Sequence, residues 1–309
     1  MELGTPERAD GEDVGGNNST DPIRNSIQES VAQEHARQLH TGQRFRFGRN
    51  WTHFLKYLNE ERIAEAEGNL CEFLGRDSLR GKTFLDIGSG SGLSSLAARR
   101  LGAVVTSFDF DTLSVACTKE LRRRFFPGDP FWGVGQGSIL DKQYIDALGQ
   151  FDIVYSWGVL HHTGAMWQAM ENVKQLVKPG GLLFIAIYND AGELSRKWQN
   201  RKRRYNALPS PLRLPYLICV WTPEQLRILL SCLRSGGLRT CISELRGDHT
   251  SRRGMSRVHD IIDWVGGYPY EYAKIEMIMD SYICDGFKPV KLRENRSYGC
   301  NQIVFRRRR

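Results

Sequence analysis

A glycine-rich turn is the part of the sequence best suited to binding a ligand. The segment 84–93 reads FLDIGSGSGL, so Gly88, Gly90 and Gly92 follow an apolar, strand-like run. Where a strand passes into a helix, glycine lets the backbone approach a ligand that a Cβ would exclude, and the helix N-terminus offers unpaired N–H groups. A dinucleotide-binding turn has Gly or Ala at its sixth position, where this chain has Leu93. The turn therefore predicts a nucleotide-like cofactor of another kind.

Carboxylates precede and follow this turn. Asp86 lies on the first strand, where it would repel a pyrophosphate but can favour a bound cation. The next predicted strand ends at Asp109, about 20 residues beyond the turn, the spacing at which a carboxylate binds a ribose diol. Asp111 is better placed to cap the following helix. We expect Asp86, Ser89, Asp109 and the adjacent Phe110 to contact the cofactor together with the three glycines.

The ends of the next two strands complete the predicted cofactor site. Ser138 and Ile139 follow the third strand, where an adenine ring would lie. Ile139 can pack on such a ring and Ser138 can accept from its exocyclic amine, although both can also be ordinary turn residues. Ser156 ends the fourth strand and Trp157 follows it directly, at the edge of an open α/β sheet where ligands bind. We expect both to lie at the site.

Two groups of residues could supply acid–base chemistry. His161 and His162 follow the fourth strand, and an imidazole that titrates near neutrality can deprotonate a hydroxyl group. The alternative is that this pair caps a helix or packs against a lid. The segment 253–271 is dense in functional side chains, among them His259 and Asp260, which is typical of a binding loop but also of a surface helix and turn. The candidate catalytic residues are thus His161, His259 and Asp260.

The segments 86–92, Asp109, 151–156, 159–162 and 176–181 together resemble one family. With these segments, the chain is similar to class I S-adenosylmethionine-dependent methyltransferases, above all to the subgroup of ubiquinone- and menaquinone-biosynthesis methyltransferases, strongly over residues 80–190. The resemblance implies S-adenosylmethionine as the cofactor. Some O-methyltransferases carry a basic histidine at the position of His161, whereas many relatives carry an acidic residue where this chain has Ser138.

The elements that must position these residues follow from the hydrophobic pattern. From residue 82 onward, apolar runs alternate with helical segments, which predicts a parallel sheet covered on both faces. We predict an α/β fold, a doubly wound Rossmann-like sheet of seven mostly parallel strands with a helical N-terminal layer and a helical insertion after the fifth strand. The expected strands are 83–87, 104–109, 132–137, 151–156, 182–188, 287–292 and 302–305.

Composition shifts divide the chain into five segments. A turn at 178–181 is expected to precede the fifth strand, and a helix capped by Thr222, with Pro223 in its first turn, is expected to reach Leu233. The predicted segments are a disordered leader (1–22), an N-terminal helical lid (23–79), the cofactor-binding core (80–189), a helical or irregular substrate insertion (190–267), and the closing helix and strands (268–309).

Composition excludes several classes of protein. A hydrophobic share of 40% is ordinary for a globular protein, and no apolar run approaches the roughly 20 residues of a membrane-spanning helix. The seven cysteines are scattered, with no CxxC, and no His, Cys, Asp or Glu set has metal-ligand spacing, so we expect no disulfide frame and no metal. With no signal-like N-terminal segment, a cytoplasmic location is expected.

The basic charge belongs to the last third of the chain. Residues 190–309 carry a net charge of +11, whereas residues 1–189 carry −3.

We expect methylation of a small-molecule acceptor, at oxygen before nitrogen or carbon. RNA methylation is an alternative because of the arginine-rich runs 201–204 and 306–309, and a catalytically silent cofactor-binding subunit is another. The basic run 196–204 beside the apolar run 212–221 suggests contact with an anionic membrane surface as a further alternative. The sequence does not specify an oligomeric state.

Overall fold

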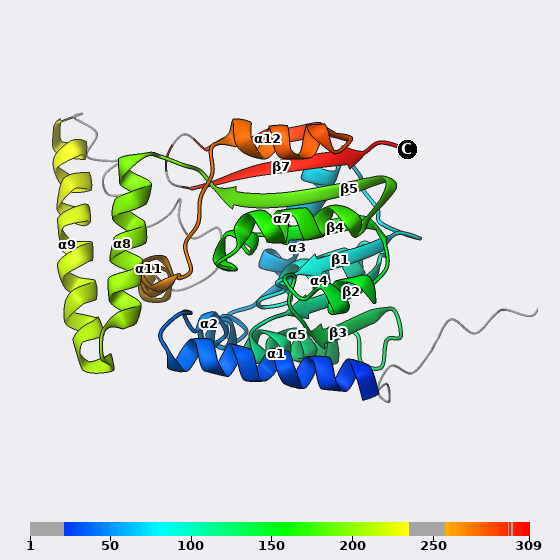
Figure 1. Cartoon of the computed structure of the whole chain (residues 1–309), viewed down its shortest axis with the longest axis horizontal. Coiled ribbons are helices and arrows are strands. Elements are labelled where there is room, and N and C mark those ends of the chain that lie inside the picture. Colours follow the sequence, from blue (N-terminus) through cyan, green and yellow to red (C-terminus); the bar gives the residue numbers. More distant parts are fainter. Residues whose placement is uncertain (1–21, 235–256, 296, 298) are drawn as a thin grey trace, which may run out of the picture.

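The chain folds around one seven-stranded sheet. The computed structural model describes residues 22–234, 257–295, 297 and 299–309. The strand order is β3-β2-β1-β4-β5-β7-β6; the first five strands along the chain are parallel, and β7 is antiparallel to both of its neighbours (Figure 1). The predicted fold class is confirmed. The strands are β1 (Thr83–Ile87), β2 (Val104–Asp109), β3 (Trp132–Gln136), β4 (Phe151–Trp157), β5 (Val177–Tyr188), β6 (Phe287–Arg293) and β7 (Cys300–Arg307).

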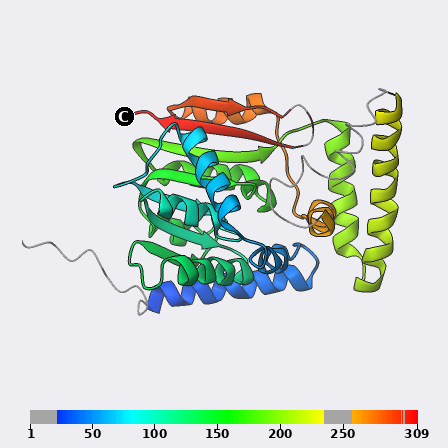
Figure 2. The same ribbon diagram turned by 180° about the vertical axis from the view of Figure 1, so that it is seen from behind.

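Helices cover both faces of this sheet. One face packs against α3, α4 and α5, and the other against α6, α7 and α12, so the sheet lies between two helical layers (Figures 1 and 2). The helices in the described part of the chain are α1 (Pro22–His40), α2 (Phe47–Phe54), α3 (Glu60–Leu74), α4 (Leu93–Arg100), α5 (Thr112–Phe125), α6 (Lys142–Asp146), α7 (Met166–Gln175), α8 (Glu193–Ala207), α9 (Ser210–Arg234), α11 (Arg257–Gly266) and α12 (Ile275–Cys284), with a 3₁₀ turn at Leu160–His162.

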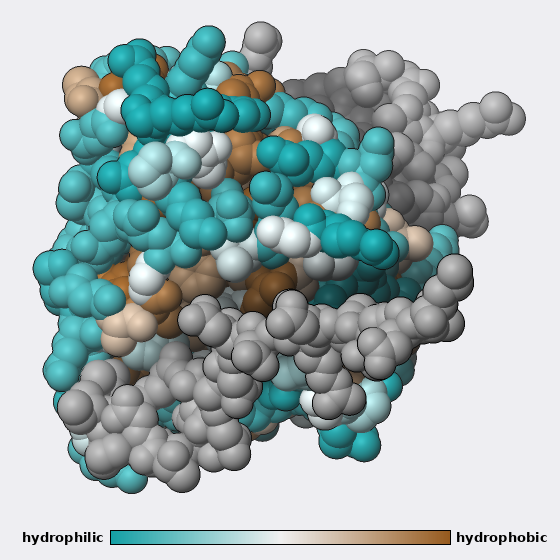
Figure 3. Space-filling view, turned by 90° about the vertical axis from the view of Figure 1, so that its right-hand side faces the viewer, coloured by the Kyte–Doolittle hydropathy of each residue, from teal (hydrophilic) through white to brown (hydrophobic). Residues whose placement is uncertain are grey.

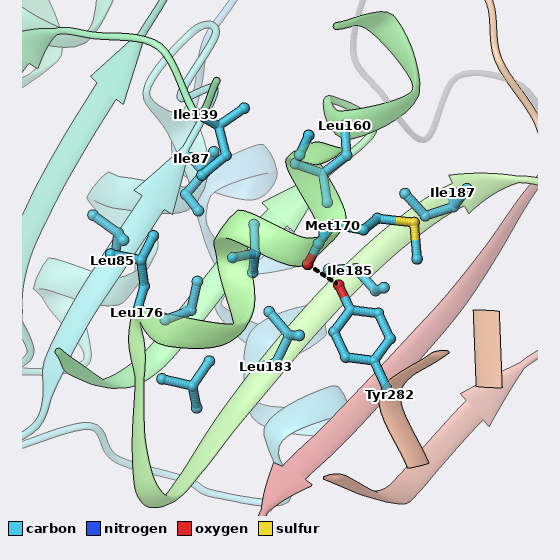
Figure 4. Close-up of a cluster of buried hydrophobic side chains, with 14 of the residues drawn as sticks. Leu85, Ile87, Ile139, Leu160, Met170, Leu176, Leu183, Ile185, Ile187 and Tyr282 are labelled. Atoms are coloured by element: carbon cyan, nitrogen blue, oxygen red, sulfur yellow. Dashed lines mark hydrogen bonds between the residues drawn. The ribbon is translucent and has the colours of Figure 1, made fainter. Parts of the chain in front are cut away.

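Alternation along the strands builds a separate core on each face. Leu85 and Ile87 of β1 point into the cluster with α7 and α12, whereas Phe84 points into the cluster with α3 and α4. Figure 4 shows the first cluster, in which Tyr282 of α12 donates a hydrogen bond to the Met170 carbonyl over 3.2 Å. This bond satisfies a buried hydroxyl and ties two helices of the same layer together.

The two ends of the parallel strands differ. At the amino-terminal ends of the strands, the part of the surface that Figure 3 leaves uncovered is mainly hydrophilic, with some hydrophobic patches. Helix α1 runs along the β3 edge of the sheet toward the carboxyl ends of the strands, where α2 follows it, and α8, α9 and α11 form a further helical group at these ends (Figure 1). Ligands in open α/β sheets bind at the carboxyl ends of the strands, so these helices cover the expected place for a site.

A buried lysine joins the helices of that further group. Lys202 of α8 is fully buried; its ammonium group donates a hydrogen bond to the Trp264 carbonyl of α11 and lies 4.2 Å from the centre of the Trp264 ring. The Tyr270 ring is 4.8 Å away. Burying a charge is costly unless polar and aromatic groups surround it, so this contact favours one docking position of α11 on α8.

Several local expectations need correction. The segment 178–181 lies within β5 as an irregularity, because the pairing with β4 jumps from Val177 to Leu182. No helix starts at Thr222: α9 continues through it, and the Thr222 hydroxyl donates to the Ile218 carbonyl as it would inside a helix.

The predicted N-terminal segments also need comment. Within the segment predicted as a lid (23–79), helix α3 instead packs against the sheet. Nearly all of the expected disordered leader, residues 1–21, lies outside the described residues.

No helix in the described ranges combines the length and apolar character needed to cross a bilayer.

The two-layer core predicts which side-chain truncations lower the free energy of unfolding most. Leu183 of β5 is fully buried, whereas Leu292 of β6 is 46% exposed. Leu183→Ala should lower the free energy of unfolding by about 2–5 kcal/mol because it leaves a cavity, and Leu292→Ala should change it by less than about 1 kcal/mol. Urea unfolding of both variants measures this difference. Equal costs would mean that β5 is not at the centre of the core.

Candidate cofactor and acceptor site

A cavity of about 430 Å³ opens at the carboxyl ends of the strands, a size typical of small-molecule sites. Its floor comes from the turns after β1 to β4, and its cover comes from α1, α2 and the segment between them. From the floor, the lining includes Gly88, Gly90, Asp109, Phe110, Ser138, Ile139, Trp157 and His162, and from the cover Val31, Glu34, Gln38, Arg44, Phe45, Phe47 and Trp51.

The glycine turn leaves room that side chains would fill. Gly88 and Gly90 have φ values of +73° and +55°, in the left-handed region that favours glycine. A Cβ on Gly90 would lie 3.1 Å from the Trp51 indole, and one on Gly88 would lie 2.4 Å from Val159. The turn is thus a backbone cradle beneath an aromatic side chain, as required for the close approach of a nucleotide-like ligand.

Asp109 fixes this cradle at the end of β2. Its carboxylate accepts the N–H of Gly90 over 2.9 Å and the N–H of Asp111 over 2.8 Å. Burial raises the pKa of Asp109 to about 6, although these two N–H groups and the Arg44 charge act in the opposite direction. Asp109 lines the cavity where the sequence predicted a ribose contact.

Asp111 attaches the cover to the floor. As expected, it caps α5, accepting the Leu113 N–H over 2.8 Å. The same carboxylate accepts the Gly48 N–H of α2 over 2.9 Å and lies 3.6 Å from Nε2 of His35 in α1. One side chain therefore holds both covering helices over the cavity.

Arg44 brings a positive charge to the cavity wall. Its guanidinium lies 4.7 Å from the centre of the Phe110 ring and donates to Gln38 and to the His162 carbonyl. Burial lowers the pKa of Arg44 to about 10, opposed by the carboxylates of Asp109, Asp111 and Glu34, so the group stays charged at neutral pH. The wall thus combines an aromatic surface with one fixed cation.

The structure brings seven of the predicted cofactor residues to this cavity: Gly88, Gly90, Asp109, Phe110, Ser138, Ile139 and Trp157. Ile139 presents an apolar, 4% exposed side chain to it, and the Ser138 hydroxyl accepts the Leu140 N–H over 3.2 Å. Trp157 donates from Nε1 to Gln302 of β7 over 3.3 Å, which orients its ring at the wall.

Four other predicted contacts lie behind the wall and do not line the cavity. The Asp86 carboxylate accepts from the Ser95 hydroxyl over 2.5 Å, so it faces α4 rather than the ligand space. Ser89 hydrogen-bonds Thr118 over 2.9 Å, and Gly92 packs against the same residue. The Ser156 hydroxyl donates to the Ile87 carbonyl over 3.3 Å. These four residues therefore support the glycine turn and the strand ends from the side of the wall that faces away from the cavity.

The two neighbouring histidines have different environments. His161 is fully buried and is not part of the lining; its Nδ1 accepts the Tyr188 N–H over 3.3 Å, and the two rings lie 4.0 Å apart. Its position gives no support to a role as general base. His162 lines the cavity, lies 4.9 Å from the Phe47 ring, and hydrogen-bonds the Pro269 carbonyl through Nδ1.

The second predicted catalytic pair lies on α11. The backbones of His259 and Asp260 belong to this helix, but their side chains lie outside the described residues. Their catalytic role stays a prediction.

The sequence predicted an N-terminal helical lid over residues 23–79, a range that includes α1 and α2, but it singled out none of the side chains there that line the cavity. The missed residues include Arg44, Phe45, Phe47 and Trp51. The signal that could have found them is the RFRFGRNW segment, in which aromatic residues alternate with arginines. Such a segment combines apolar area with fixed charge, which suits a ligand wall better than a core helix.

Comparison with known proteins defines the class. Residues 52–233 match the family model described as a methyltransferase domain, and the chain belongs to this family. The chain is 30% identical over 140 residues to a ubiquinone biosynthesis O-methyltransferase of Rhizobium leguminosarum bv. trifolii and 29% identical over 140 residues to one of Brucella melitensis; each match covers 44% of this chain and 54% of the relative. The chain thus spans about half the length of the curated relatives it matches.

The fold is also similar to that of the magnesium protoporphyrin IX methyltransferase of Synechocystis PCC 6803, solved with bound SAH. The identity is 13%, the TM-score is 0.47, and the match covers 92% of this chain and 98% of that one.

The buried carboxylate behind the glycine turn predicts a pH dependence of stability. Burial raises the pKa of Asp86 to about 7, with Asp109 adding to the rise and the Ser95 hydrogen bond opposing it. Because the folded state binds this proton more tightly than the unfolded state, its contribution to stability is fully present below about pH 4 and is lost as the pH rises through about 7.

Asp86→Asn should remove this pH-dependent contribution to stability. Between pH 4 and 7, the unfolding free energy of the variant should fall less steeply than that of the wild type, by up to about 1.4 kcal/mol per pH unit. Urea unfolding at several pH values measures both slopes. Parallel curves would show that Asp86 does not titrate in this range.

Proposed function

We propose that this chain transfers a methyl group from S-adenosylmethionine to the oxygen of a small-molecule acceptor. The observation that carries this proposal is the glycine cradle held by the Asp109 carboxylate, which opens into a covered cavity with aromatic walls. Family membership supports methyl transfer, and the names of the curated relatives support oxygen as the accepting atom.

The residues on the cavity floor fit this cofactor. Gly88 and Gly90 would hold its amino-acid end close to the backbone, Asp109 would accept from the ribose hydroxyls, and Ile139 would pack on the adenine. S-adenosylmethionine, when bound, supplies an electrophilic methyl group on sulfonium. The chain then has to align the acceptor and exclude water, which is the task of the cover formed by α1 and α2.

His162 is the best-placed side chain for taking the acceptor proton. A carbonyl oxygen only accepts hydrogen bonds, so the contact with Pro269 places the proton on Nδ1. In the neutral ring the basic lone pair is then on Nε2. Phe47 and Trp157 would stack an aromatic acceptor beside this ring, and the Arg44 charge would stabilise the phenolate formed when the proton leaves.

RNA methylation has less support. In the described chain, none of the residues lining the cavity comes from the basic runs 201–204 and 306–309. The cover also narrows the cavity to the size of a small molecule. A transfer assay with labelled S-adenosylmethionine, a panel of phenols and catechols, and RNA with and without ribonuclease would separate the two functions.

The cradle predicts a specific loss of cofactor affinity. Gly90→Ala places a Cβ against Trp51 inside the cavity, so binding of S-adenosylmethionine, measured by calorimetry, should weaken by at least about tenfold. Gly75→Ala is the matched control: Gly75 has a similar φ of +61° but open space around its Cβ position, remote from the cavity.

Both variants should lose about 1–2 kcal/mol of stability from the left-handed backbone, and the control should bind the cofactor like the wild type. An equal loss of affinity in both variants, or tight NAD binding by the wild type, would refute the assignment of the cradle.

The histidine pair predicts a division of roles. His162→Gln should lower kcat for a phenolic acceptor by about 10²–10⁴-fold while leaving S-adenosylmethionine affinity within a few fold, as for loss of a general base. His161→Gln should act on stability, because it alters a buried contact with Tyr188. A loss of kcat in stable His161→Gln protein, with His162→Gln unaffected, would reverse the assignment.

A further inference from the structure

Helix α9 has two very different faces. The face toward α8 is engaged in contacts: Arg213 donates to the carbonyls of Leu208 and Asn206, and the Tyr216 hydroxyl donates to the Arg201 carbonyl. The opposite face, at helical spacing, presents Pro211, Leu214, Pro215 and Ile218 to solvent, with Leu212 and Cys219 at its margins. We call this the α9 apolar face.

The α9 apolar face is exposed to an unusual degree for aliphatic side chains. Leu212, Leu214 and Ile218 are 52%, 64% and 57% exposed, and the sequence from 214 to 222 contains no charged residue. Among the described residues, α9 packs through its other side, which contributes Leu217 to the aromatic cluster with α8 and α11. A contiguous exposed apolar surface on a folded protein marks a place of interaction.

The neighbouring helix supplies positive charge. In α8, the exposed side chains include Arg196, Lys197, Arg203 and Arg204, and the one acidic residue of this helix, Glu193, is paired with Lys197. From residue 193 to residue 222 the chain has seven basic residues and one acidic residue. A surface that fits this pair of helices must therefore be apolar and negatively charged at once.

The pair is also the outermost part of the molecule on its side. α9 lies at the edge farthest from the sheet in both opposite views, with α8 between it and α11 (Figures 1 and 2). A flat surface could therefore approach α9 without meeting the sheet. Its apolar residues are aliphatic and proline, whereas protein-binding surfaces are enriched in aromatic residues.

We propose that the α8–α9 pair docks on an anionic lipid surface. The aliphatic side chains of the α9 apolar face enter the boundary between headgroups and acyl chains, and the exposed cations of α8 contact the headgroup charges. The helix lies on the bilayer and does not cross it. This inference is independent of the proposed methyl transfer, because it uses no residue of the cavity.

Vesicle flotation of the full chain tests the proposal. The wild type should float with vesicles of phosphatidylglycerol and phosphatidylcholine, and not with phosphatidylcholine alone; raising the salt concentration should weaken the binding. The double variant Leu214→Glu/Ile218→Glu should bind at least about tenfold more weakly, because two charges would have to enter the apolar boundary. The variant Arg203→Gln/Arg204→Gln should bind roughly tenfold more weakly and depend less on salt.

A matched control separates docking from a general effect of added charge. Val290 and Leu292 of β6 are 45% and 46% exposed on a different part of the molecule, so Val290→Glu/Leu292→Glu makes the same chemical change elsewhere and should bind vesicles like the wild type. Thermal unfolding of each variant verifies its fold.

The proposal is overturned if the wild type stays in the soluble fraction with anionic vesicles at low salt, or if the β6 variant loses binding as strongly as the α9 variant. A wild-type dimer in sedimentation, dissociated by Leu214→Glu/Ile218→Glu, would instead assign the face to a second copy of the chain.

Discussion

The carboxylate of Asp109 is the constraint on which the site depends. By accepting the N–H groups of Gly90 and Asp111, it holds the glycine turn and the turn after β2 in one arrangement at the carboxyl edge of the sheet. The left-handed glycines keep side chains out of the space above, and Asp111, positioned by the same bond, holds α1 and α2 over it. Floor and cover thus share one network of charge-assisted hydrogen bonds.

Electrostatic balance within this network suits methyl transfer. Arg44 stays charged although partly buried, close to the Asp109 carboxylate, whose pKa its charge lowers. In the proposed reaction, a cationic cofactor and an acceptor that becomes anionic would each meet an opposite charge in this cavity. The aromatic side chains Phe47, Trp51 and Trp157 also line the cavity and would shield the reacting groups from solvent.

The sequence predicts the sheet well because its strands carry continuous apolar runs and its turns carry glycine. It predicts the floor of the site for the same reason: Gly90, Asp109 and Ile139 follow strands, and parallel strands end at one edge. One wrong assignment and one omission have physical causes. Asp86 has the same chemistry as Asp109, but the pleat of β1 turns it toward Ser95. The predicted N-terminal lid did not identify its own lining residues, because helical periodicity does not distinguish a side chain that faces a ligand from one that faces a core. Contacts between segments far apart in the chain, such as Gly48 with Asp111, leave no local signal.

The most direct test of this account is a crystal structure of the full chain with S-adenosylhomocysteine. The account predicts the product in the covered cavity, with its ribose at Asp109, its adenine on Ile139, and Trp51 above the glycine turn. A product bound elsewhere, or bound in this cavity with its ribose away from Asp109, would contradict the claim that this carboxylate organises the site.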